Sequence, residues 1–120
     1  MEKFIKILLI NSVAFSLFSG PNEDLLDAAK NGDLAGVEAA IRADANIDAV
    51  DNYGNNALIF AAANGHIDIV RFLLDKGADA DMTNSLNNNV LMPAAQWGHA
   101  KIVELLLLAG IDINSKGDLK

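Results

Sequence analysis

The chain has 120 residues, of which 52% are apolar and 21% are charged, so it is long enough for one small globular domain with a buried core. Its 9 basic and 16 acidic residues give a net charge of -7 at pH 7, which repels a polyanion and argues against nucleic acid as a partner. Because cysteine is absent, disulfides, thiolate metal sites and cysteine nucleophiles are all excluded.

Residues 1–20, MEKFIKILLINSVAFSLFSG, differ in character from the rest of the chain. Two lysines precede an apolar run over residues 7–18, and Ser19 and Gly20 follow it, which is the order of segments in a secretory signal peptide. We therefore predict that the segment is removed and that the protein is exported, to the periplasm or out of the cell. Two alternatives remain open. The segment is retained either as an apolar helix that packs on a cytoplasmic domain, or as an anchor that holds the protein at a membrane.

Residues 21–120 repeat with a period of 33. Three series of identical residues mark the period: Gly32, Gly65 and Gly98; Ala28, Ala61 and Ala94; Leu25, Leu58 and Leu91. A fixed period of this length is typical of repeat proteins, in which each unit buries its apolar face against its neighbours. The units cover about residues 22–54, 55–87 and 88–120 of a single repeat domain.

Within each unit the apolar pattern predicts two short helices, over residues 58–64 and 68–76 in the second unit. Gly65 and Gly77 follow these helices, where a residue with positive φ would end each of them. The stretches between units are rich in Asp, Asn and Gly and are predicted to form projecting loops. The predicted fold class is therefore all-α.

Two stretches carry a resemblance to a known family: NGHIDIVRFLLDKGADAD over residues 64–81 and WGHAKIVELLLLAGIDIN over residues 97–114. Both are similar to the ankyrin-repeat family, and the resemblance implies an ankyrin-repeat solenoid of stacked helix-turn-helix units with projecting turns. The family's T-P-L-H motif is replaced by Asn-Ala-Leu-Ile at residues 56–59, so we expect the hydrogen bonds of that motif to be lost. Pro93 lies in the first helix of the third unit, and we expect it in the first turn, where its missing N–H is tolerated.

The two histidines, His66 and His99, each follow a glycine and lie one period apart. Stacked helices are about 8 to 10 Å apart, whereas a shared zinc ion needs ring nitrogens at about 2.0 to 2.1 Å and two further ligands. We therefore predict no metal site; the resemblance implies instead that each imidazole bonds to loop backbone and ties its unit to the neighbouring one. No nucleophile with a base and an orienting group is recognisable, so we expect neither a catalytic site nor a cofactor.

The resemblance implies a protein partner, bound on the surface made by the loop tips and the first helices. The predicted contact residues are Lys30, Tyr53, Phe60, Asn64, Leu86, Gln96 and Trp97, with neighbours such as Asp27 and Asn52. Trp97 is the foremost candidate, because Asn31 and Asn64 hold its position in the other units and tryptophan is enriched at interface hot spots. The alternative is that Trp97 only covers the end of the stack. The leucine run of residues 105–108 further predicts an exposed apolar patch on the last helix, which would serve self-association, a partner, or further repeats of a longer protein.

Overall fold

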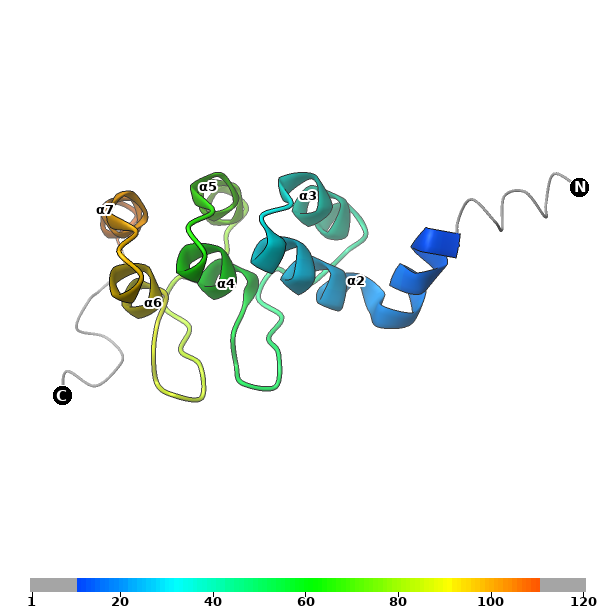
Figure 1. The fold of residues 1–120 in the computed structure, drawn as a ribbon, viewed down its shortest axis with the longest axis horizontal. Helices are drawn as coiled ribbons and strands as arrows, with labels where there is room; N and C mark the ends of the chain where they lie inside the picture. The colour runs from blue at the N-terminus through cyan, green and yellow to red at the C-terminus, as the bar shows by residue number, and fades with distance from the viewer. Residues whose placement is uncertain (1–10, 111–120) are drawn as a thin grey trace, which may run out of the picture.

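The computed structural model describes the backbone of residues 11–110 and the side chains of residues 20–110. The described part contains six helices, shown in Figure 1: α2 (Asn11–Asn31), α3 (Leu34–Arg42), α4 (Ala57–Ala63), α5 (Ile67–Asp75), α6 (Leu91–Gln96) and α7 (Ala100–Leu108). The all-α prediction is confirmed, and the helices predicted over residues 58–64 and 68–76 begin and end one residue earlier than expected.

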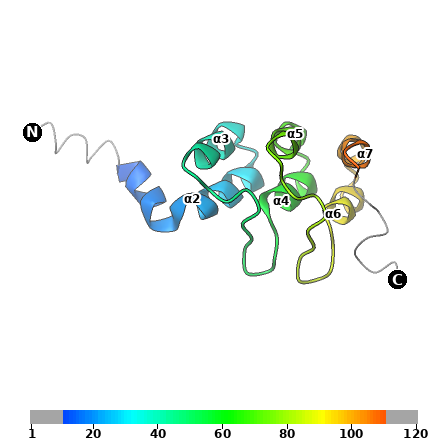
Figure 2. The same ribbon diagram turned by 180° about the vertical axis from the view of Figure 1, so that it is seen from behind.

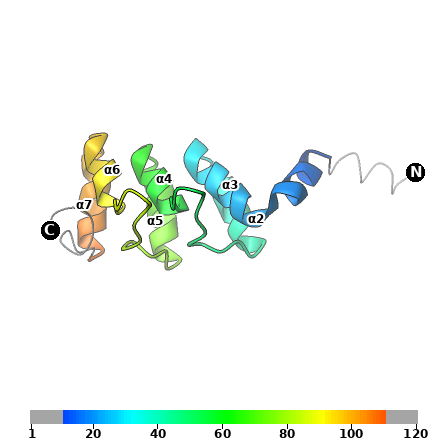
Figure 3. The same ribbon diagram turned by 90° about the horizontal axis from the view of Figure 1, so that it is seen from below.

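The helices form two layers. Figure 1 and the reverse view in Figure 2 show α2, α4 and α6 side by side in one layer and α3, α5 and α7 in the other. Each unit contributes one helix to each layer, because a short turn reverses the chain between them. The loops over residues 43–56 and 76–90 project from the stack in the same direction, as Figures 1 and 2 show, and Figure 3 views them from below.

Equivalent apolar side chains from successive units fill the core between the layers. Leu25, Leu58 and Leu91 are at most 8% exposed, and the series Ala28, Ala61 and Ala94 is buried beside them. In the second layer Leu73 and Leu106 are fully buried, whereas the first unit has the smaller Ala40 at the same position. The first unit is therefore thinner than the other two.

Gly20 divides α2 into two helical segments. Its backbone is not helical, with φ 84° and ψ 162°, and Pro21 begins the second segment. Proline fits this first position, because its fixed φ suits a helix and no N–H is needed there. Figure 1 shows the segment before Gly20 directed away from the stacked units. Residues 1–10 lie outside the described part of the chain, so the predicted signal peptide remains a prediction.

None of the helices within residues 11–110 is long and apolar enough to cross a bilayer.

The predicted helix ends are confirmed. Gly65 and Gly77 have φ of 80° and 91° where α4 and α5 end, and Pro93 is in the first turn of α6. We expected the hydrogen bonds of the motif at residues 56–59 to be lost, and for the first residue, Asn56, this expectation is wrong. The Asn56 side chain accepts a hydrogen bond from the Ile59 N–H at 2.8 Å and so caps α4. Asparagine can take this role because its side-chain oxygen reaches the same backbone N–H groups that a threonine hydroxyl would.

Candidate functional site: the surface of first helices and hairpins

The two histidines form equivalent joints between units. Nε2 of His66 lies 3.3 Å from the carbonyl oxygen of Lys30, and Nε2 of His99 lies 3.0 Å from that of Ala63. Each imidazole therefore bonds to the preceding unit, as predicted, although the acceptor belongs to the last turn of a helix and not to a loop. Each histidine ring also covers a glycine of the preceding unit: a Cβ added to Gly65 would lie only 2.7 Å from Cε1 of His99.

The loops between units are hairpins whose turns are organised by side chains. In the first hairpin, Oδ1 of Asp51 accepts hydrogen bonds from the N–H groups of Tyr53 and Asn55, both at 2.9 Å. In the second hairpin Asn84, 33 residues later, does the same with the N–H groups of Leu86 and Asn88. The hairpins therefore repeat in detail, as the helices do.

Hydrogen bonds tie the hairpins to each other, two of them near the tips. The Ser85 N–H donates to the carbonyl of Tyr53 at 2.8 Å, and Nδ2 of Asn84 donates to Oδ1 of Asn55 at 2.9 Å. The tips are fixed side by side with their apolar side chains in solvent: Tyr53 is 68% exposed and Leu86 is 73% exposed.

The seven predicted contact residues lie on two kinds of element. Tyr53 and Leu86 are at the hairpin tips; Lys30, Phe60, Asn64, Gln96 and Trp97 are on the first helices or directly after them. Trp97 is 64% exposed, and Lys30 and Gln96 are also exposed. Asn64 has a structural role besides, since its amide donates to the Lys30 carbonyl at 3.0 Å. Their contact with a partner remains a prediction.

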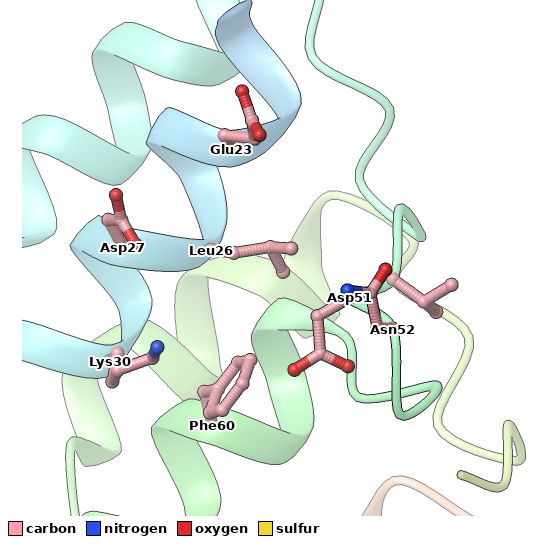
Figure 4. A pocket seen from close by; sticks show the side chains of 8 residues that line it. Glu23, Leu26, Asp27, Lys30, Asp51, Asn52 and Phe60 are labelled. Atoms are coloured by element: carbon pink, nitrogen blue, oxygen red, sulfur yellow. The ribbon is translucent and has the colours of Figure 1, made fainter. Parts of the chain in front are cut away.

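The structure brings Lys30 and Phe60 together in a pocket of about 330 Å³, shown in Figure 4. Nζ of Lys30 lies 4.8 Å from the centroid of the Phe60 ring, which is a cation–π contact. The pocket is lined from α2, the first hairpin and α4 by Glu23, Leu26, Asp27, Lys30, Val50, Asp51, Asn52 and Phe60. Sequence reasoning missed four of these residues: Glu23, Leu26, Val50 and Asp51.

The C-terminal end of the described stack is open. Leu108 is 81% exposed and Leu107 is 46% exposed, and among the described residues no group beyond the adjoining chain lies within 4 Å of a Cβ placed on Gly98. Leu108 lies beside Leu105 and Leu74 in a shallow, mainly apolar hollow between α5 and α7. This is the surface on which the leucine run predicted self-association, and that association remains a prediction.

Within the described residues, no group of three or more His, Asp or Glu side chains is placed to hold a metal ion. The two histidines serve separate joints. Several loop carboxylates bond to backbone: Oδ1 of Asp48, for example, accepts from the Asp79 N–H of the next unit at 2.9 Å.

These features define a class: a helical repeat protein whose units are pairs of antiparallel helices joined by projecting hairpins. A family model described as ankyrin repeats, in 3 copies, matches residues 25–117. The chain belongs to the ankyrin-repeat family. No curated protein gives a significant match to the chain.

Proposed function

We propose that this protein is a non-catalytic binding module that holds a partner protein on the surface formed by the hairpin tips and the first helices. Ankyrin repeats are protein–protein interaction modules, which supports the class of function. The observation that carries the proposal is Trp97. Its position needs no large side chain for folding, because Asn31 and Asn64 occupy it in the other units, yet its indole is 64% exposed beside this surface. An exposed aromatic side chain on a rigid scaffold is suited to anchor a partner.

The test compares two variants of the full chain as bait in extracts of the source cells. Trp97→Asn installs the residue of the other two units, so the fold is expected to remain intact. Binding of the captured partner should weaken by about 2 kcal/mol or more, which is roughly thirtyfold in Kd. The identified partner is then purified, and its Kd for each variant is measured by calorimetry.

Leu108→Ala is the control. Like Trp97, Leu108 is an exposed apolar residue, but it lies on α7, in the layer of second helices and outside the proposed surface. It should leave the Kd unchanged. If Leu108→Ala weakens binding and Trp97→Asn does not, the partner occupies the end of the stack and the proposed surface is wrong.

We also propose that the binding module is exported. The proposal rests on the lysines, apolar run and small residues of residues 1–20. The mass of the intact protein isolated from its own cells tests it. Removal of about twenty N-terminal residues is the expected result. A full-length mass would instead favour the retained segment, either as a helix of a cytoplasmic module or as a membrane anchor.

A further inference from the structure

The pocket in Figure 4 combines an apolar base with an acidic rim. Leu26 is only 7% exposed, and with the ring of Phe60 and the exposed side chain of Val50 it provides apolar surface. Glu23 and Asp27 stand one helical turn apart on α2, and Asp51 lines the pocket from the first hairpin, with its carboxylate on the Phe60 side in Figure 4. A guest that fits both surfaces has a hydrocarbon stem and a positively charged end.

The negative charges of the pocket exceed its one positive charge. Lys30 is the single basic residue in the lining, against the three carboxylates of Glu23, Asp27 and Asp51. Although Lys30 follows Asp27 by three residues, its ammonium lies over the Phe60 ring. No described residue forms an ion pair with Glu23 or Asp27. Glu23 and Asp27 are both exposed, so a cation from solvent can reach them.

The charge of Asp51 is not needed by its hairpin. One oxygen of Asp51, Oδ1, accepts the hydrogen bonds from both N–H groups of the turn. In the second hairpin Asn84 accepts the two equivalent hydrogen bonds with the oxygen of a neutral amide. The carboxylate of Asp51 therefore carries a charge and a second oxygen beyond what the turn uses. The equivalents of Glu23 and Asp27 in the second unit are Asn56 and Phe60, so the repeat does not require acids at those positions either.

We propose that this pocket receives a lysine or arginine side chain of the partner protein. The stem of the guest lies on Leu26 and Val50, and its charged end is directed toward the carboxylates that line the pocket. Phe60 holds Lys30 aside through its ring. The proposal rests on the proposed function, since it specifies the chemistry of the bound partner: a basic side chain at the N-terminal half of the same surface that Trp97 serves further along the stack.

A probe for this pocket is the tripeptide acetyl-Gly-Arg-Gly-amide, with its lysine counterpart, titrated into the labelled full chain and followed by NMR. The matched neutral probe carries citrulline, which keeps the shape of arginine and lacks its charge. We expect saturable shifts of the backbone amides of Asn52 and Phe60 with at least one basic probe, and weaker binding at high salt. Equal shifts with citrulline, or shifts centred elsewhere, would overturn the proposal.

Two charge variants sharpen the test. Asp51→Asn keeps the turn acceptor and removes the charge, and binding of the basic probe should weaken about threefold. Asp75→Asn, on the last residue of α5, removes an exposed carboxylate away from the pocket and should change nothing. Lys30→Met removes the competing cation and should strengthen binding. Equal affinities of wild type and Asp51→Asn would refute the role of the pocket.

The outcome is separable from that of the proposed function. If the basic probes fail while Trp97→Asn still weakens binding of the partner, the surface binds a partner without using this pocket, and only the pocket proposal falls. If the probes bind but capture does not depend on Trp97, the pocket stands and the proposed anchoring role of Trp97 falls.

Discussion

The joint between the second and third units and the open end of the stack contain the same turn in two environments. Gly65 and Gly98 have nearly the same φ, 80° and 77°. The ring of His99 covers Gly65, whereas no neighbouring group within the described residues lies within 4 Å of a Cβ on Gly98. The turn therefore takes its shape from its own unit, and at Gly65 the neighbouring unit adds the imidazole of His99. This is the behaviour of a one-dimensional stack, in which stability is the sum of unit terms and neighbour terms.

The largest effect should come from alanine at the covered glycine. Gly65→Ala strains the backbone and also displaces the His99 ring, so we expect the free energy of unfolding to fall by about 3 kcal/mol. Gly98→Ala brings the backbone strain alone and should cost about 1 kcal/mol. Urea denaturation followed by circular dichroism measures both. Equal losses would mean that the histidine contact contributes nothing to the stack.

Removing the two histidines should lower the free energy of unfolding by different amounts, and this difference should be smaller than that between the two glycines. The carbonyl of Lys30 accepts from Asn64 as well as from His66, so it keeps a donor when the imidazole is removed. We therefore expect His66→Ala to lower the free energy of unfolding by about 0.5 kcal/mol and His99→Ala by about 1.5 kcal/mol. Adding Asn64→Ala to His66→Ala should bring the first joint to the level of the second. A larger loss from His66→Ala alone would contradict this account.

The smallest change in stability should come from the open end. Leu108 occupies the position of Asp75 in the preceding unit and is 81% exposed, so Leu108→Asp should change the free energy of unfolding by less than about 0.5 kcal/mol. If the leucine surface mediates self-association, sedimentation of the wild type should show a species larger than a monomer that the variant lacks. Identical sedimentation of the two proteins would rule out this surface as an interface between copies.

Local features of the fold were predictable from the sequence. The period places Gly65 and Gly77 at helix ends, and Pro93 had only one tolerated place in a helix. The family motif, which has threonine at this position, does not predict the capping role of Asn56, although the asparagine side chain offers the same kind of acceptor. The histidine joints were expected in general outline, but the acceptor depends on how far the imidazole reaches across the stack.

The pocket could not be predicted in the same way. Its residues come from α2, the first hairpin and α4, and no pattern within one unit brings Glu23 and Asp51 to the same opening. Their approach depends on where the hairpin lies relative to α2, and the Phe60 side of the pocket comes from the next unit. Lys30 and Phe60 were predicted as contacts, but their pairing with each other was visible only in three dimensions.

The hydrogen bonds between the hairpins have a thermodynamic consequence for recognition. Because Ser85 bonds to Tyr53 and Asn84 to Asn55, the two tips already share one arrangement before any partner arrives. A partner that contacts both Tyr53 and Leu86 therefore loses little conformational entropy in ordering them. Preorganisation of this kind favours slow dissociation. It also lets the small exposed surfaces of the two tips act together when they bind one partner.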